Sequence, residues 1–202
     1  MRLGLVRGFS LVELMVAMVA GLLLVAAVTA LFATILRANS TAMKVSRLNQ
    51  EIQAITDMMA RDIQRAGYDA SAALTLVSGA TSPFYFDATT DLASNCVKVK
   101  YDDDADGVLD NTSSAGETRR YNYSSGEKAI RLDQGSTASC SAGEKISTED
   151  TIEITDLTFT MLSGSVSTGA RTIQLSITGN DKQSPALKLT LQRDIKLRND
   201  GF

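Results

Sequence analysis

The feature that most constrains this chain is an uncharged apolar run near its start. The run covers Leu14–Leu36, which is 23 residues. About 20 apolar residues in a helix are enough to cross the roughly 30 Å hydrocarbon core of a bilayer. The segment before it carries two charges, Arg2 and Arg7, and both are positive. Because positive flanks stay in the cytoplasm, the sequence predicts a single membrane helix that starts on the cytoplasmic side.

An acidic residue, Glu13, lies directly before this run. A carboxylate carried to the bilayer centre costs about 2.5 to 3.5 kcal/mol, so we expect Glu13 to be kept for a partner. An ordinary secretory signal and a plain single-pass anchor are the alternative interpretations. The apolar core of a signal, however, is only about 7 to 15 residues long and gains nothing from an acid.

The residues Gly8-Phe9-Ser10-Leu11-Val12-Glu13 resemble the processing signature of type IV prepilins and pseudopilins. The resemblance implies that residues 1–8 are a leader, which prepilin peptidase removes after Gly8. It also implies that the new N-terminal residue, Phe9, is methylated on its amine. Glu13 would then pair with the Phe9 amine of a neighbouring subunit and set the assembly register. Neutralising each charge against the other offsets the penalty of holding either one in lipid.

The segment after Leu36 predicts that the same helix continues as an amphipathic one. It contains no proline, and its apolar residues recur at spacings of three and four, which favours one buried helical stripe. These residues are Val45, Leu48, Ile52, Ile55, Met59, Ile63 and Ala66. We therefore expect one long helix over residues 9–67, with a membrane and assembly half at 9–36 and an amphipathic half at 37–67. Gly67 is the expected helix-ending glycine.

From residue 68 the pattern changes to short segments typical of strands. Segments with strand-like composition or alternation are Ala73–Val77, Phe84–Phe86, Val97–Tyr101, Tyr121–Tyr123, Ala129–Leu132, Ile152–Met161, Ile173–Ile177 and Leu187–Leu191. We expect residues 68–202 to form a β-rich periplasmic domain with a mostly antiparallel sheet, one face of it covered by the amphipathic half of the helix. The expected fold class is α+β, and the resemblance to type IV prepilins implies the pilin fold. Two segments, Met59–Tyr68 and Arg193–Asn199, are similar to those of PilW-type minor pilins and, for the first, of the related type II secretion pseudopilin GspJ.

Composition narrows the chemistry of that domain. Histidine is absent, which excludes Ser-His-Asp and Cys-His catalysis and His-ligated zinc, and we expect no enzyme activity. The net charge is −3, which argues against nucleic-acid binding. The two cysteines, Cys96 and Cys140, would form a disulfide in an oxidising periplasm, and two unpaired buried thiols are the alternative.

One constellation, within Tyr101–Asp110, predicts metal chemistry. Asp102, Asp104, Asp106 and Gly107 fit the D-x-D-x-D-G opening of a calcium loop, in which aspartates two residues apart share one hard cation. The further predicted ligands are the carbonyl of Val108 and the carboxylates of Asp110 and Glu117. The pattern departs from the template because Ser113 stands where a bidentate glutamate is expected. A solvated acidic turn without metal is the alternative.

The resemblance implies a minor pilin of the type IV pilus that is similar to PilW and helps to initiate assembly, with a place at the fibre tip as one option. Its implied partners are other minor pilins, the major pilin, prepilin peptidase and the assembly platform. The implied location is the inner membrane, with a single span, and later the pilus. A minor pseudopilin similar to GspJ is the alternative function. A tip adhesin or DNA-uptake module is a further one, although the acidic, aromatic-poor domain argues against it.

Overall fold

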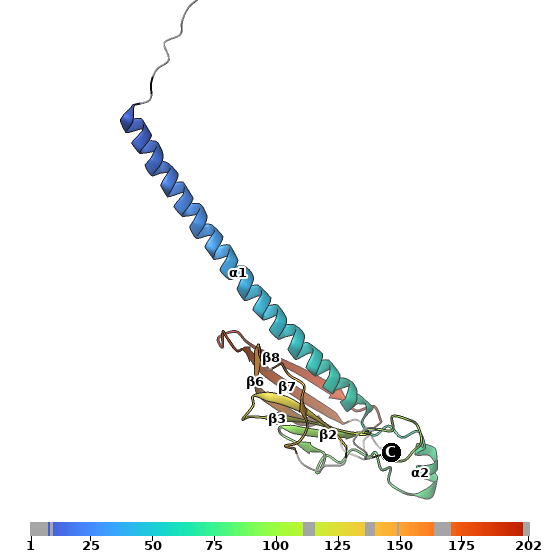
Figure 1. Cartoon of the computed structure of the whole chain (residues 1–202). Helices are drawn as coiled ribbons and strands as arrows, with labels where there is room; N and C mark the ends of the chain where they lie inside the picture. Colours follow the sequence, from blue (N-terminus) through green and yellow to red (C-terminus); the bar gives the residue numbers. More distant parts are fainter. Residues whose placement is uncertain are drawn as a thin grey trace, which may run out of the picture. The chain divides into compact units, whose positions relative to one another are not determined.

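The computed structural model describes residues 8, 10–110, 116–135, 140–148, 150–163 and 171–199. The predicted leader, apart from Gly8, and the predicted methylation site Phe9 lie outside these residues. The described elements are α1 (Leu11–Arg65), α2 (Ala72–Ser78), β1 (Leu92–Ala93), β2 (Cys96–Lys100), β3 (Thr118–Ser124), β4 (Ala129–Gln134), β5 (Glu144–Lys145), β6 (Ile152–Ser163), β7 (Thr172–Asp181) and β8 (Lys188–Lys196) (Figure 1). The chain divides into two units, Met1–Lys44 and Val45–Phe202.

The first unit contains the apolar part of α1. The first backbone hydrogen bond of the helix runs from the Leu14 amide to the Ser10 carbonyl, at 3.1 Å. Large apolar side chains are exposed all around this part, for example Leu22 and Leu31, which are 67% and 63% exposed. A helix with apolar residues on every side fits a lipid environment and not a water-facing one. By length and composition, α1 is able to cross a membrane.

The second unit contains the amphipathic part of α1, and the predicted buried stripe is largely confirmed. The buried apolar residues of this part are Leu48, Ile52, Ile55, Met59, Ala60 and Ile63, followed by Ala66 just after the helix. The prediction was wrong for Val45, which is 46% exposed, so burial begins one turn later than expected. The predicted domain limits at residues 8, 36 and 67 stay predictions.

The strands form two antiparallel sheets in place of the single sheet expected. One has the strand order β1-β2-β3-β4-β5, and the other has the order β6-β7-β8. Every strand pair among the described residues is antiparallel. The strand β6 is 12 residues long, and its register against β7 shifts at two places, between Ile154 and Asp156 and between Met161 and Ser163. Such bulges bend and twist a strand.

Both sheets and the helix contribute to one hydrophobic core. Val97 and Tyr121 come from the first sheet, Ile173 and Ile177 from the second, and Ile52 from α1, and each of these residues is 0% exposed. The expected α+β class, a long N-terminal helix on antiparallel sheet, is therefore confirmed.

Two predicted strands are absent from the described structure. Ala73–Val77 belongs to the helix α2, because Asp69 accepts a hydrogen bond from the Ser71 amide at 2.7 Å and turns the chain into a helical start. Gly79, with φ of 69°, ends that helix. The segment Phe84–Phe86 is an irregular turn whose phenylalanine rings are buried, and a hydrogen bond from the Phe84 amide to Ser82 Oγ fixes its conformation.

The end of α1 is held by the last described residues of the chain. Gly67 follows the helix with φ of 81°, a conformation that glycine adopts without strain, as predicted for a helix-ending position. The Arg198 amide donates to the Gln64 carbonyl at 3.4 Å, and Asn199 Nδ2 donates to the Arg65 carbonyl at 3.3 Å. Carbonyl groups at the helix end, which have no partner within the helix, are thus satisfied by the end of the chain.

Candidate functional site

The predicted processing and register residues lie at the start of α1. Gly8 is exposed and precedes the helix, and Glu13 lies in the first helical turn and is also exposed. A carboxylate is favoured there because the amino end of a helix carries a partial positive charge. The helix beyond it, from Leu14 to Leu36, presents only uncharged side chains. The segment therefore combines one acid with an apolar surface that water does not favour.

A second feature, which the sequence did not reveal, is a buried polar network around Asp62. Its carboxylate accepts hydrogen bonds from the hydroxyl of Tyr121 at 2.5 Å and from that of Tyr101 at 3.3 Å. Arg119 Nη1 lies 3.3 Å from Asp62 Oδ2 and forms an ion pair with it. Asp62 comes from α1, Tyr121 and Arg119 come from β3, and Tyr101 follows β2. The network therefore joins the end of the helix to the five-stranded sheet.

The environment of this network perturbs the two phenols. Burial, and next the negative charge of Asp62, raise the pKa of Tyr101 and of Tyr121 well above the ordinary value of 10.0. Both tyrosines are 0% exposed, so their hydroxyls have no water to replace Asp62. The Arg65 guanidinium also lies 4.0 Å from the centre of the Tyr101 ring, within the range of a cation–π contact. The arrangement stabilises the contact between the end of the helix and the five-stranded sheet.

The predicted calcium ligands are only partly brought together. Asp102, Asp104 and Asp106 each offer a carboxylate oxygen, and these oxygens lie within 4.8 Å of one another. Asp102 is buried, and the other two are exposed. Among the described residues, neither Asp110 nor Glu117 belongs to this group. Ser113, at the twelfth position of the template, lies outside the described residues.

Glu117 has a different position from the one its predicted role requires. It is 2% exposed, and its Oε1 and Oε2 accept hydrogen bonds from the amides of Asp103 and Asp110, both at 2.8 Å. Glu117 therefore bridges the two ends of the acidic loop through the backbone. Val108 is 58% exposed, and its amide donates to Asp106 Oδ1 at 2.7 Å. The structure thus reduces the carboxylate set to three aspartates.

The two cysteines are joined. Cys96 at the start of β2 and Cys140 before β5 form a disulfide with a Cα–Cα distance of 5.9 Å. The alternative of two unpaired thiols is not what the structure contains. The bond links the second strand of the five-stranded sheet to the segment that leads into its last strand.

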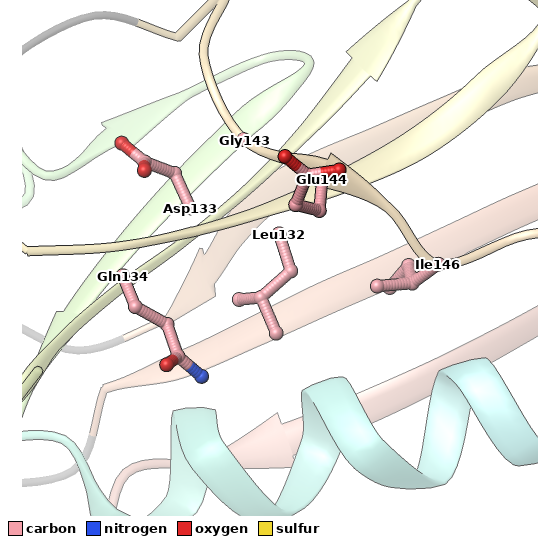
Figure 2. Close-up of a pocket in the computed structure, with 6 residues that line it drawn as sticks. All are labelled: Leu132, Asp133, Gln134, Gly143, Glu144 and Ile146. Carbon is pink, nitrogen blue, oxygen red and sulfur yellow. The ribbon is translucent and has the colours of Figure 1, made fainter. Parts of the chain in front are cut away.

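A pocket of about 580 Å³ lies beside β4 and β5 (Figure 2). In Figure 2 the side chains of Leu132 and Gln134 extend to one side of β4, whereas Asp133 extends to the other, as strand alternation requires. The other residues lining the pocket are Gly143, Glu144 and Ile146. Asp133 is paired with Arg120 at 3.0 Å. Among these six described residues there is no nucleophile next to a base, so the pocket does not resemble a hydrolytic site.

Comparison with protein families identifies the class of this chain and then its family. The prokaryotic N-terminal methylation motif matches residues 5–29. Together with the apolar helix, this motif defines a prepilin-type protein that fits a single-pass membrane anchor. The family described as prepilin peptidase-dependent protein B matches residues 41–197, more than half of the 202 residues, and the chain belongs to this family. It is therefore a type IV pilin-like minor pilin, and its family description implies processing by prepilin peptidase. Neither the comparison with curated proteins nor that with solved structures gives a match.

One signal in the sequence could have revealed the Asp62 network. Asp62 lies three residues after Met59 and seven after Ile55, so it occupies a position on the buried side of the helix. A charged residue at such a position requires a partner in the core. Tyr101 and Tyr121 lie on predicted strands and carry the hydroxyls that supply it.

Proposed function

We propose that this protein is a minor pilin of the PilW type that helps to initiate assembly of a type IV pilus. In this proposal α1 anchors the precursor in the inner membrane, and residues 68–202 lie in the periplasm. After removal of the leader the subunit joins other minor pilins and the major pilin on the assembly platform, and it enters the fibre near the tip. The protein acts through these contacts and not as an enzyme.

The observation that carries the proposal is the uncharged, exposed apolar part of α1 with one acid in its first turn. Large apolar side chains there are 48% to 74% exposed, so the segment has no partner among the described residues. In lipid this surface is stable, and within a fibre it packs against the equivalent helices of other subunits. The transfer from lipid to fibre exchanges one apolar environment for another, so specific polar contacts decide the register.

Glu13 supplies that polar contact. A carboxylate near the bilayer costs about 2.5 to 3.5 kcal/mol when it is carried to the centre, and pairing with a cation offsets this cost. The amine of a processed neighbour, at Phe9, is a cation of the right kind. The pair therefore selects the axial position at which a new subunit joins the fibre.

We expect the second unit to determine which pilin subunits lie next to this one in the fibre. The strands β6 and β8 are the edges of the three-stranded sheet, and β1 and β5 are the edges of the five-stranded one. Edge strands carry unpaired backbone groups and are the natural places for contact with another chain. The short length of β1 and β5, two residues each, limits such pairing. Backbone hydrogen bonds from the Ile154 amide to the Lys128 carbonyl and from the Phe159 amide to the Ser94 carbonyl occupy part of the outer edge of β6, so β8 is the better candidate.

The experiment that tests the proposal compares substitutions at both ends of the apolar segment. Glu13→Ala should leave processing intact but abolish or strongly reduce surface pili seen by electron microscopy. Thr29→Ala is the matched control, because Thr29 Oγ1 bonds to the Val25 carbonyl of its own helix at 2.6 Å and needs no neighbour. Gly8→Phe should leave full-length precursor in the membrane.

Normal piliation in the Glu13→Ala strain would contradict the register role, and normal mature protein from Gly8→Phe would contradict the processing step. Co-purification from the membrane tests whether the protein belongs to a pilus or to a secretion system. The expected companions are pilins and the pilus assembly platform. Recovery of secretion-system components in their place would support the pseudopilin alternative and overturn the pilus proposal.

A further inference from the structure

The loop that follows β2 has the composition and the spacing of a cation-binding loop. Three aspartates at alternate positions, Asp102, Asp104 and Asp106, are followed at once by Gly107. The chain turns sharply here, with φ of 65° at Ala105 and 76° at Gly107. The turn brings one oxygen of each aspartate within 4.8 Å of the others. Three carboxylates at this separation repel one another unless a cation lies among them.

A second observation concerns a single oxygen of Asp102. This residue is only 1% exposed, and its Oδ1 is buried without any hydrogen-bond partner among the described residues. The other oxygen, Oδ2, is fully used, because it accepts from the amides of Ala70 at 3.1 Å and Gly107 at 3.0 Å. A buried carboxylate oxygen without a partner is strongly unfavourable. A cation bound to Asp102 removes that penalty. In an ordinary solvated turn the aspartates are exposed to water, so no carboxylate oxygen would be buried without a partner.

The cations already present in the neighbourhood do not fill this role. Arg65 is directed to Asp103, with 2.6 Å between Nη2 and Oδ1. Among the described residues none forms an ion pair with Asp102, Asp104 or Asp106. The three carboxylates therefore form a negatively charged site. The neighbouring acid Asp103 does not add to it, because Arg65 neutralises it.

The donor set selects the class of cation. All candidate donors are oxygens, and the chain has no histidine and no free thiol, which disfavours zinc and copper. Hard oxygen donors from an irregular loop suit Ca²⁺, which accepts six to eight ligands of irregular geometry, better than Mg²⁺, which requires a near-ideal octahedron. The exposure of Asp104 and Asp106 leaves room for water ligands.

We propose that Asp102, Asp104 and Asp106 bind one calcium ion, and that this ion fixes the loop against the start of α2. The same Asp102 carboxylate that lacks one partner holds both Gly107 of the loop and Ala70 before α2. Gly107 also approaches Ser71 so closely that a β-carbon at this position would lie 2.3 Å from Ser71 Oγ. Binding at Asp102 therefore stabilises two segments that are separated by more than 30 residues.

The surface that the bound ion would stabilise is the apolar surface of α2. The helix α2 presents Leu74 and Val77, which are 74% and 89% exposed, and none of its residues is buried. A helix of seven residues without buried side chains gains little stability from packing. The calcium loop supplies this stability instead, so the geometry of the apolar α2 surface depends on calcium.

Glu117 has a supporting function in this arrangement. Because it bridges the Asp103 and Asp110 amides, it closes the loop without using the cation. The site therefore keeps three protein carboxylates, with the Val108 carbonyl and water as further ligands. Few charged ligands and an open side give weak affinity, on the order of 10⁻⁴ to 10⁻³ M, as in extracellular calcium modules.

The test uses the mature full chain in detergent micelles, with calcium chloride as the ligand, terbium as its luminescent substitute and magnesium chloride as the competing cation. Terbium, which occupies calcium sites, should luminesce on excitation of tyrosine, because Tyr101 adjoins Asp102. Calcium should displace the terbium and raise the temperature of unfolding. The double variant Asp104→Asn/Asp106→Asn should weaken calcium binding at least about tenfold, since it removes two of the three charges. Asp156→Asn, at an exposed aspartate of β6, is the matched control and should bind as the original chain does.

Three results would overturn the proposal. The first is the absence of terbium luminescence and of any calcium-dependent stabilisation at millimolar calcium. The second is equal binding by the double variant and the Asp156→Asn control. The third is equal stabilisation by magnesium chloride. Circular dichroism in chelator should be the same for the double variant and the original chain, because both altered side chains are exposed. None of these measurements depends on pilus assembly, so failure here and failure of the proposed function are distinguishable.

Discussion

Removal of the Asp62 carboxylate should destabilise the second unit far more than removal of any exposed acid on the same helix. In the Asp62→Ala variant, the hydroxyls of Tyr101 and Tyr121 lose their acceptor while both residues stay 0% exposed. Each buried donor left without a partner costs about 1 to 3 kcal/mol. Arg119 is 26% exposed on its side chain, so water replaces part of its lost contact.

The sum for two buried hydroxyls is about 2 to 6 kcal/mol, and broken buried ion pairs typically cost about 3 to 5 kcal/mol. We therefore expect the free energy of unfolding to fall by about 3 to 5 kcal/mol, a large share of the roughly 5 to 15 kcal/mol of a typical domain. The matched control is Asp57→Ala on the same helix. Asp57 pairs with Arg193 at the surface, where both side chains are about half exposed, so this change should cost less than about 1 kcal/mol.

The assay is urea unfolding of the full chain in detergent, followed by tyrosine fluorescence and circular dichroism. An unchanged dependence on urea concentration would show that stability, and not the extent of unfolding, has changed. A double-mutant cycle isolates the contact itself. Tyr121→Phe alone should cost about 1.5 to 3 kcal/mol, because its hydroxyl donates to a charged group. Combined with Asp62→Ala it should cost clearly less than the sum of the two.

Two outcomes would refute the reasoning. If Asp62→Ala and Asp57→Ala unfold at the same urea concentration, the buried network does not stabilise the fold. If Tyr121→Phe and Asp62→Ala are strictly additive, the 2.5 Å contact between these side chains has no energetic content.

Three further predictions concern the same unit. The free energy of unfolding should fall as the pH rises above about 10, by up to about 1.4 kcal/mol per pH unit for each buried tyrosine. The reason is that the phenols ionise in the unfolded chain, whereas the folded chain keeps their pKa raised. In urea titrations at alkaline pH, Tyr121→Phe should lose less stability per pH unit than the original chain. Replacing Cys96 and Cys140 by serine should cost about 4 kcal/mol in the chain-entropy model for a separation of 44 residues, measured by urea unfolding. Gly67→Ala should lower the temperature of unfolding, because a β-carbon would lie 2.6 Å from the Asn199 carbonyl oxygen at φ of 81°, whereas Gly126→Ala meets no atom and should have little effect.

The outcomes that contradict these three predictions are equally specific. Equal alkaline slopes for the original chain and Tyr121→Phe would show that the Tyr121 phenol is not protected by burial. Identical unfolding of the oxidised chain and the double serine variant would remove the disulfide from the account of stability. A Gly67→Ala variant as stable as Gly126→Ala would mean that the chain end moves away from the helix without penalty.

The helix was predictable because its pattern is strong and local. Spacings of three and four placed Ile52, Met59 and Ile63 on one side, and all three are buried. The helix-ending function of Gly67 followed from its position after the last apolar residue, and its positive φ agrees. Local periodicity and the chemistry of a single residue type were sufficient in these cases.

Short segments were less predictable because hydrogen bonds from outside them decide their conformation. Ala73–Val77 has the composition of a strand, yet Asp69 and Gly79 define a helix. Burial of Phe84 and Phe86 alternates as in a strand although no strand forms. The division into two sheets depends on which strands pair, and the pairing partners lie up to tens of residues apart.

The residues of the candidate site were predictable where a sequence motif brings them together. They were not predictable where contacts between distant segments bring them together. The D-x-D-x-D-G spacing correctly grouped three aspartates, because alternate residues of a tight turn can converge. Glu117 was assigned as a ligand from sequence, but its bonds to two backbone amides depend on how β3 enters the sheet. Asp62 received no assignment because its partners, Tyr101 and Tyr121, are 39 and 59 residues away.

The attachment of Asn199 to the end of α1 has a consequence for the order of events during synthesis. The contacting residues are 134 positions apart, and the Asp57 to Arg193 ion pair spans 136. Contacts this distant form slowly, since the intervening chain must be ordered before they give any stabilisation. The apolar stripe of α1 is therefore synthesised long before the strands that cover it. We expect the newly synthesised helix to bind the membrane surface or a chaperone until β8 has been synthesised and packs against it.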